Sequence, residues 1–181
     1  MAAAYPPGGT FFDTIKKSFN DVPTENGVAT TPFLEAAESL TTLLKIRDRQ
    51  LEAPMDSENL QDLVRNELKA KKHIATEGLL WLTRGLDFTA QALRQNLSNS
   101  GEELSASFRA AYGNTLKPHH SFVVKPLFSA AMSATPYRKD FYAKLGDDQG
   151  RVEKELNIWL QGLEKDVRIL KEFMASKEAK W

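Results

Sequence analysis

A tryptophan, Trp81, lies between two glycines at the spacing of one helix face. Gly78 comes three residues before it and Gly85 four residues after it. Side chains three and four positions apart are neighbours on a helix, so the indole would have an unusually bare flank. Such a ring can stack on a ligand, and Arg84, three residues on, brings a five-donor guanidinium beside it. The alternative is a core tryptophan whose glycines let another helix approach, since tryptophan is highly buried on average.

A pair of histidines, His119 and His120, offers a second polar group on an apolar background. Adjacent residues point about 100° apart on a helix, so the two rings cannot share a face there. His120 lies four residues after Leu116 and four before Val124, on an apolar stripe. It is predicted either as a core histidine bonded to backbone or as a polar anchor at the mouth of an apolar space, where it would hold an amide or hydroxyl.

The composition narrows the class of function. The 181 residues carry 24 Lys and Arg against 24 Asp and Glu, and this zero formal charge argues against a dedicated nucleic-acid binder. Cysteine is absent, three histidines leave little room for zinc, and no phosphate-binding loop or nucleophile motif is found. We therefore predict no metal, no cofactor and no enzymatic activity. No signal-peptide pattern and no run of roughly 18 apolar residues occurs, so we expect a cytoplasmic protein.

Apolar residues at steps of three and four run through most of the chain and predict an all-α fold. Residues 1–10 are expected to form a flexible arm, and residues 11–181 a single domain. Helices are expected over 11–19 and from a Thr31-Pro32 start to about 51. A further helix is expected to begin at a cap, Asp56 or Ser57, and to break at 73–76. The next would then run from a Thr76 cap to 97. Later helices are expected from Leu104, with a kink or a restart at Pro118 and a further kink at Pro126, then over 141–145 and 152–174.

Four short motifs occur in the order in which one known family carries them. They are Pro32-Phe33-Leu34-Glu35-Ala36, Leu80-Trp81-Leu82-Thr83-Arg84-Gly85-Leu86, Lys117-Pro118-His119-His120 and Ala134-Thr135-Pro136-Tyr137-Arg138-Lys139-Asp140-Phe141. Over nearly all of the chain from Phe11 onward, the sequence resembles the glycolipid transfer proteins, in particular their fungal branch linked to heterokaryon incompatibility. The resemblance implies a two-layer helical sandwich that carries glycosphingolipids between membranes without catalysis, and we expect a monomer.

The resemblance also implies the roles of individual residues. The sugar headgroup would stack on Trp81 and contact Lys45, and His120 would bond the ceramide amide. The lipid chains would occupy an apolar tunnel, or its portal, lined by Phe33, Tyr112, Leu116, Phe122 and Phe128. Burying an alkyl chain stabilises a complex by about 0.8 kcal/mol per CH₂, so a long ceramide needs few polar contacts.

The chain departs from the family on the second helix. There the family carries an Asp-x-x-x-Asn-x-x-Lys headgroup motif, whereas here Leu44 passes directly to Lys45. Lys45 fits the motif lysine, but the Asp, the Asn and the preceding stretch are missing, about twenty residues worth roughly 30 Å of helix. We therefore expect one helical region of the sandwich to be shortened or fused.

Two residues before the gap could substitute for the missing polar groups. Glu38 and Thr42 lie seven and three residues before Lys45, which is the motif's own spacing. On one helix the three side chains would fall within about 60° and offer an acceptor, a hydroxyl and an ammonium. The alternative is coincidence, with Glu38 and Thr42 facing elsewhere.

Apolar and basic residues also gather after His120. Phe122 and Tyr137, with Lys125 and Arg138, could form an apolar tip with a basic fringe that docks transiently on a membrane surface. The same residues could be ordinary solvated surface. Two functions therefore stay open: a glycosphingolipid carrier, or a lipid-sensing or interaction protein (or an inactive splice or gene-model product) that lacks transfer because its headgroup motif is incomplete.

Overall fold

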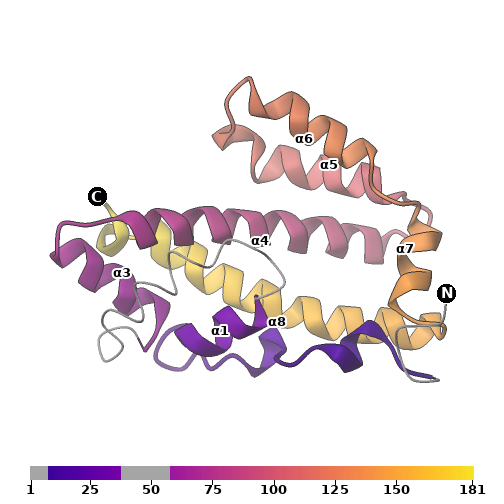
Figure 1. The fold of residues 1–181 in the computed structure, drawn as a ribbon, viewed down its shortest axis with the longest axis horizontal. Helices are drawn as coiled ribbons and strands as arrows, with labels where there is room; N and C mark the ends of the chain where they lie inside the picture. The colour runs from indigo at the N-terminus through magenta and orange to yellow at the C-terminus, as the bar shows by residue number, and fades with distance from the viewer. Residues whose placement is uncertain (1–7, 38–57) are drawn as a thin grey trace. The chain divides into compact units, whose positions relative to one another are not determined.

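The computed structural model describes residues 8–37 and 58–181. Glu38, Thr42 and Lys45 lie outside these ranges. The described residues form seven α-helices, with isolated bridges but no strand, as the all-α prediction requires. In chain order these helices are α1 (Thr30–Ala36), α3 (Leu60–Lys69), α4 (Ile74–Ser98), α5 (Leu104–Asn114), α6 (Val124–Ser133), α7 (Arg138–Leu145) and α8 (Gln149–Ala175) (Figure 1).

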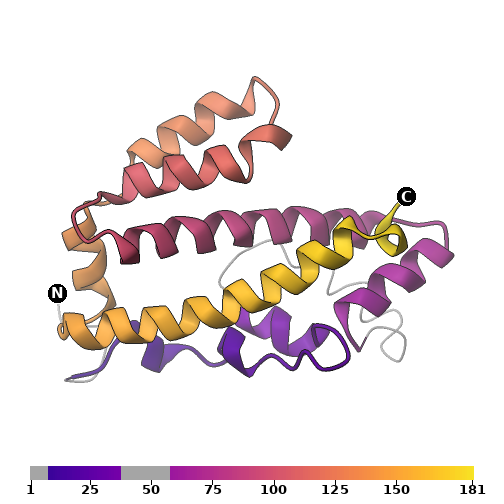
Figure 2. The same cartoon turned by 180° about the vertical axis from the view of Figure 1, so that it is seen from behind.

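The chain divides into two compact units, and the two longest helices contribute to both. The first unit contains the chain up to Ile15 and residues Gly85–Leu160, and the second contains Lys16–Arg84 and Gln161–Trp181. Within the first unit, α5 and α6 lie side by side in both views (Figures 1 and 2). Each unit has its own packed core and is described separately.

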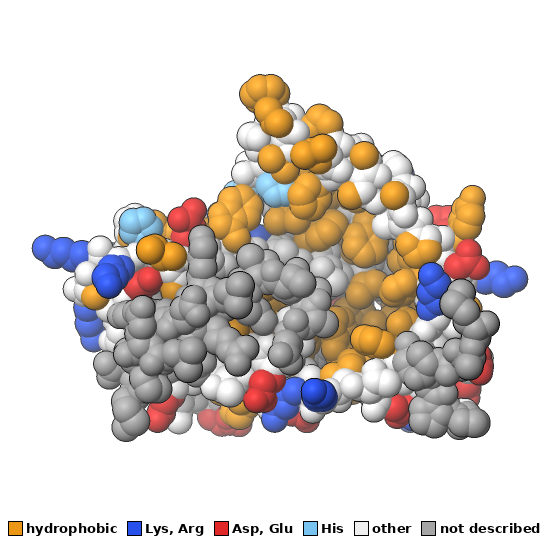
Figure 3. Space-filling view, in the orientation of Figure 1, with side chains coloured by type: hydrophobic (Ala, Val, Ile, Leu, Met, Phe, Trp, Pro, Cys, Tyr) orange, Lys and Arg blue, Asp and Glu red, His pale blue; other side chains and the backbone are white. Residues whose placement is uncertain are grey.

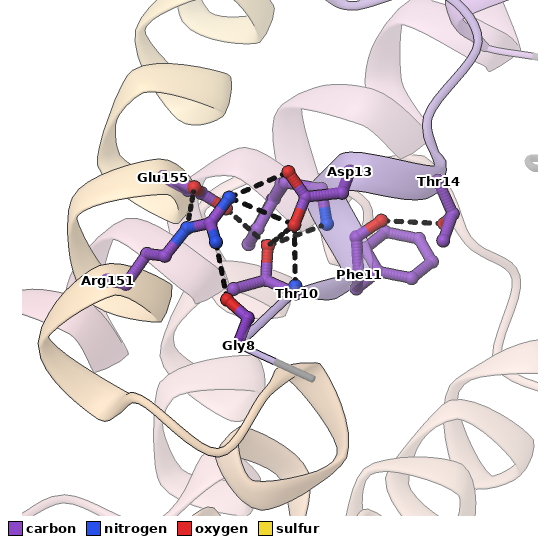
Figure 4. A network of polar contacts seen from close by, with 8 residues as sticks. Gly8, Thr10, Phe11, Asp13, Thr14, Arg151 and Glu155 are labelled. Carbon is purple, nitrogen blue, oxygen red and sulfur yellow. Dashed lines mark hydrogen bonds and ion pairs between the residues drawn. The ribbon is translucent and has the colours of Figure 1, made fainter. Parts of the chain in front are cut away.

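The beginning of the described chain is fastened to α8 by a polar network (Figure 4). Thr10 is fully buried and its hydroxyl donates to the Glu155 carboxylate. Arg151 on α8 binds Asp13 at 2.7 Å and Glu155 at 2.6 Å, and also donates to the Gly8 carbonyl. Residues 8–10 therefore belong to the folded unit, and the arm expected over 1–10 does not extend as far as Thr10.

The helix expected over 11–19 is instead two short 3₁₀ turns, Phe11–Thr14 and Phe19–Asp21. Each turn is started by its own capping box. Thr10 and Asp13 exchange bonds around the first, and Ser18 and Asp21 do the same around the second. The first turn ends at Thr14, and the backbone is extended at Ile15 and again at Ser18, the cap of the second turn. The spacing of the phenylalanines therefore does not produce a continuous helix.

The core of the first unit joins α4, α5, α7 and α8. It consists of six buried residues, with Trp159 partly buried against them: Leu93, Leu104, Tyr142, Val152, Leu156 and Leu160. The period of three and four read from residues 152–174 is confirmed, since Leu163, Val167 and Leu170 continue the buried face of α8 into the second unit.

In the second unit, α8 approaches the Phe19 turn very closely. A Cβ added to Gly162 would lie 2.4 Å from the backbone nitrogen of Asn20, so only glycine fits. Phe19 packs edge-on against Phe33 at 5.8 Å between ring centroids, and both are fully buried. Helix α1 begins at Thr30 rather than after a Thr31 cap, and Pro32 lies in its first turn, where a missing N–H costs nothing.

Three other predicted helix boundaries were wrong. The side chain of Asn59 caps α3, rather than Asp56 or Ser57, and α3 ends at Lys69, before the expected break. Helix α4 then begins at Ile74, ahead of the proposed Thr76 cap. The restart expected as one alternative at Pro118 is confirmed, because α5 ends at Asn114 and a 3₁₀ turn, Lys117–His119, precedes a new helix, α6. Pro126 lies in the first turn of α6.

Candidate functional site

Trp81 lies on α4 with its indole partly in solvent. The residue is 39% exposed, and the Arg84 guanidinium carbon lies 4.8 Å from the ring centroid. Nothing would lie within 4 Å of a Cβ added to Gly85, so the flank on that side is open. Burial lowers the pKa of Arg84. The ring is therefore accessible, as the stacking interpretation requires, with a cation against it.

The exposure of Trp81 follows from the pattern of α4. Leu79, Leu82 and Leu86 are buried and repeat at three and four, so they define the face that packs inward. Trp81 lies two residues from Leu79, about 200° around the helix, which directs it away from that face. The helix buries leucine and leaves the larger aromatic side chain at the surface.

His120 lies beside Tyr112, but not on a helix. It follows the 3₁₀ turn with extended backbone, so the apolar helical stripe through Leu116 and Val124 does not exist. The Tyr112 hydroxyl and His120 Nδ1 are 3.2 Å apart. Burial lowers the pKa of His120, and the nearby His119 and Lys125 lower it further, which favours a neutral imidazole near pH 7. Burial also raises the pKa of Tyr112, so its hydroxyl stays protonated.

An aromatic cluster surrounds His120 in the first unit. The Phe128 ring lies 4.5 Å from the imidazole centroid, and Tyr112 stacks on Phe128 at 5.2 Å with an interplanar angle of 8°. Leu116 is buried in the same cluster, with Phe88 and Phe108 packed around it. Three residues predicted for the lipid tunnel, namely Tyr112, Leu116 and Phe128, thus meet at His120.

Two further members of the cluster, Phe88 and Phe108, were not predicted from the sequence. Phe88 contacts Tyr112 and Phe128, each at 6.4 Å between ring centroids, and Phe108 contacts Phe88 at 5.4 Å. The signal for Phe88 was present, since it follows Trp81 by seven residues, or two turns on the same side of a helix. Phe108 gave no such signal, because its partner comes from another helix.

Two other predicted tunnel residues, Phe33 and Phe122, are not part of this cluster. Phe33 is fully buried against Phe19 in the second unit. Phe122 is 85% exposed and is not part of the cluster at His120. Of the two roles assigned to Phe122, membrane contact fits this exposure and tunnel lining does not. The predicted headgroup residue Lys45 lies outside the described residues.

Hydrophobic side chains gather on the outer surface of α6 (Figure 3). Phe122 and Val123 directly before α6, Leu127 on α6 and Tyr137 directly before α7 are each at least 60% exposed, and Lys125 on α6 is half-buried. We name these four apolar residues the α6 patch. Arg138 does not belong to it, because its guanidinium lies 4.1 Å from the Tyr142 ring centroid and its side chain is only 16% exposed. The predicted membrane contact through Arg138 is therefore not favoured.

Within residues 8–37 and 58–181, no three His, Asp or Glu side chains come together in a way that could hold a metal ion. None of the helices there is both long and apolar enough to cross a bilayer.

Comparison with known proteins decides the family. The sequence model described as glycolipid transfer protein matches residues 43–147, which is more than half of the chain. A glycolipid transfer protein of Aureobasidium melanogenum is 70% identical over 200 residues, covering 99% of this chain and 100% of its own. The chain belongs to the glycolipid transfer protein family.

Solved structures of this family have the same fold. The crystal structure of HET-C2, a fungal glycolipid transfer protein, matches with a TM-score of 0.90 and 57% identity, covering 95% of this chain and 100% of its own. FAPP2, which selects simple glycosphingolipids with this fold, matches with a TM-score of 0.82 and 26% identity over 95% of this chain and 98% of its own. The predicted two-layer helical sandwich and the predicted fungal relationship are confirmed.

The family membership also confirms the prediction of a non-catalytic lipid binder. The Aureobasidium alignment agrees with a missing segment as well. It spans 200 positions while this chain has 181 residues, so at least 19 positions have no counterpart here. The family match begins at residue 43, next to the predicted gap after Leu44.

Proposed function

We propose that this protein binds a glycosphingolipid and transfers it between membranes. The sugar would stack on Trp81, the ceramide amide would bond to His120, and the lipid chains would contact the aromatic cluster at His120. The observation that carries the proposal is the accessible Trp81 ring beside the open flank at Gly85. Family membership supports it, since the 70% identical relative is a glycolipid transfer protein.

The amide contact follows from the protonation of His120. A neutral imidazole has one N–H donor and one acceptor nitrogen. If the Tyr112 hydroxyl donates to Nδ1, then Nε2 carries the proton and can donate to an amide carbonyl. The low polarity around the ring strengthens such a bond, because unpaired polar groups are costly there.

The lipid chains would supply most of the binding free energy. Phe88, Tyr112 and Phe128 provide adjacent aromatic surface next to His120. Each buried CH₂ contributes about 0.8 kcal/mol, so the aromatic surface determines affinity, while the stacking on Trp81 and the hydrogen bond to His120 determine which lipid is bound.

Delivery to a membrane would use the α6 patch. Exposed apolar residues beside Lys125 suit reversible contact with the headgroup region of a bilayer. The proposal includes a monomer in the cytoplasm that touches membranes only transiently. A second function, lipid binding without transfer, is favoured by one observation, namely the positions missing relative to the Aureobasidium protein.

Transfer of a fluorescent galactosylceramide between vesicles tests the proposal. We expect transfer by the natural chain and a loss of about fivefold or more in Trp81→Ala, since aromatic stacking contributes on the order of 1 kcal/mol beyond burial. Trp81→Phe should keep part of the activity, and Ile158→Ala, a truncation of another exposed apolar residue, should keep all of it. Lipid binding without transfer by the natural chain would support the second function, and binding unaffected by Trp81→Ala would overturn the site.

A further inference from the structure

A second amphipathic surface lies in the second unit, where α3 turns into α4. Lysines crowd this turn and the neighbouring last residues of the sequence: Lys69, Lys71, Lys72, Lys177 and Lys180 are all exposed. Ile74 and Trp181 protrude among them, at 61% and 55% exposure. Figure 3 shows Lys and Arg side chains beside a histidine and hydrophobic side chains in this region. We name these seven residues the lysine corner.

A ring stack and an ion pair hold the two segments of the lysine corner together. The His73 ring stacks on Trp181, with 6.1 Å between centroids and an interplanar angle of 16°. Arg65 on α3 binds Glu178 at 2.6 Å and Asp62 at 2.8 Å. Because the Asp62 and Glu178 carboxylates pair with Arg65, these two acids do not neutralise the neighbouring lysines.

In this turn, Lys71 has a backbone conformation that glycine adopts more easily. It has φ of 54°, the left-handed region that favours glycine and costs other residues about 1 kcal/mol or more. The chain thus has a lysine where glycine would be conformationally easier. A lysine at this position is explained if its positive charge contributes to binding an anionic partner.

We propose that the lysine corner binds the surface of an anionic lipid bilayer. Lysines near such a surface are attracted to acidic headgroups, and an exposed tryptophan is a preferred anchor at the membrane interface. An acidic protein would complement the lysines but would not account for Ile74 and Trp181 protruding among them. This surface shares no residue with the Trp81 site or the α6 patch, so its binding needs no glycolipid.

Co-sedimentation with vesicles that lack glycolipid tests this surface. The probes are phosphatidylcholine vesicles with and without 20 mol% phosphatidylserine, at low and at high salt. We expect tighter binding to the phosphatidylserine vesicles, weakened by salt, and a loss of about fivefold per lysine in Lys71→Gln/Lys72→Gln. Lys144→Gln/Lys154→Gln removes two exposed lysines of the first unit and should bind like the natural chain.

Two further variants separate charge from folding. Lys71→Arg/Lys72→Arg should keep the binding, because the charge remains. Lys71→Gly removes one charge while relieving the positive φ, so it should weaken binding without lowering the melting temperature. Trp81→Ala should bind these vesicles normally, which keeps this test independent of the proposed lipid site. Binding that ignores phosphatidylserine, or that survives Lys71→Gln/Lys72→Gln, would overturn the proposal.

Discussion

Asp166 on α8 is a fully buried carboxyl in the core of the second unit. Within the described part of the chain neither of its oxygens has a hydrogen bond, and the Lys165 ammonium is 3.7 Å away. Burial raises its pKa to about 7, and Lys165 offsets only part of that effect. Since the group ionises near 3.8 when unfolded, the folded state binds more protons between pH 4 and pH 7. Its contribution therefore makes the fold less stable as pH rises through this window.

We expect Asp166→Asn to stabilise the protein above pH 7. The amide keeps the shape of the side chain but cannot ionise, so the penalty, on the order of a few kcal/mol, disappears. Melting temperatures of the two proteins at pH 4 and pH 8 measure this, with Asp147→Asn, an exposed aspartate, as the control. A variant advantage of equal size at both pH values would contradict the assignment.

The site residues differ in how far the sequence predicts them. The open flank of Trp81 was predictable from Gly85, because the two residues are four positions apart on one helix. His120 was expected near apolar residues, but on a helix that does not exist, and its contact with Tyr112 depends instead on the 3₁₀ turn at Pro118. The exposure of Phe122 depends on how α6 packs, which residue spacing does not report.

At the scale of elements, the joint between α3 and α4 is built around Glu67. This buried carboxylate accepts hydrogen bonds from the backbone N–H groups of Ala75 at 2.9 Å and Thr76 at 2.7 Å, and from the Thr76 hydroxyl at 2.6 Å. It therefore satisfies donors that the first turn of α4 would otherwise leave unpaired.

Glu67→Ala should destabilise the protein by roughly 2 to 4 kcal/mol. Three donors would lose a charged acceptor at once, and each buried unsatisfied group costs about 1 to 3 kcal/mol before relaxation. Urea unfolding of the variant beside Glu172→Ala, which removes an exposed carboxylate paired with Arg168 at 3.4 Å, measures the difference. Equal urea midpoints for the two variants would show that Glu67 does not stabilise the connection between α3 and α4.

The exposed residues of the α6 patch should affect transfer but not stability. We expect Phe122→Ala to slow glycolipid transfer severalfold without changing stability, because an exposed side chain contributes to membrane contact and not to the core. Transfer rate and melting temperature are measured together, with Lys154→Ala on α8 as the exposed control. A transfer rate equal to that of the natural chain would remove the α6 patch from the mechanism.

Helix existence was predictable from the sequence, and helix ends were not. The buried face of α8 follows directly from the spacing of Val152, Leu156 and Leu163. The start of α4 does not, because its cap comes from Glu67, eight residues before Ala75 and on another helix. Local rules find caps within three or four residues, so a cap supplied from a neighbouring element escapes them.

For the whole molecule, the decisive feature is the difference in length from the Aureobasidium relative. At least 19 positions of the alignment with the Aureobasidium relative have no counterpart here, and we predict that they include the Asp and Asn of the headgroup motif, between Leu44 and Lys45. We expect that grafting that relative's extra positions between Leu44 and Lys45 will tighten galactosylceramide binding about tenfold or more. The reason is that charged hydrogen bonds each contribute about 1.5 to 3 kcal/mol. A graft that folds but binds no better would mean that the shortened chain already has a complete headgroup site.

The most direct test of the account is the fluorescence of Trp81 during lipid binding. In a Trp159→Phe/Trp181→Phe background Trp81 is the only tryptophan left, since the chain has three. Titration with galactosylceramide should shift its emission to shorter wavelength in a saturable way, while ceramide without a sugar should produce little change. An emission spectrum that stays constant while galactosylceramide binds would contradict sugar stacking on Trp81, and with it the proposed mode of recognition.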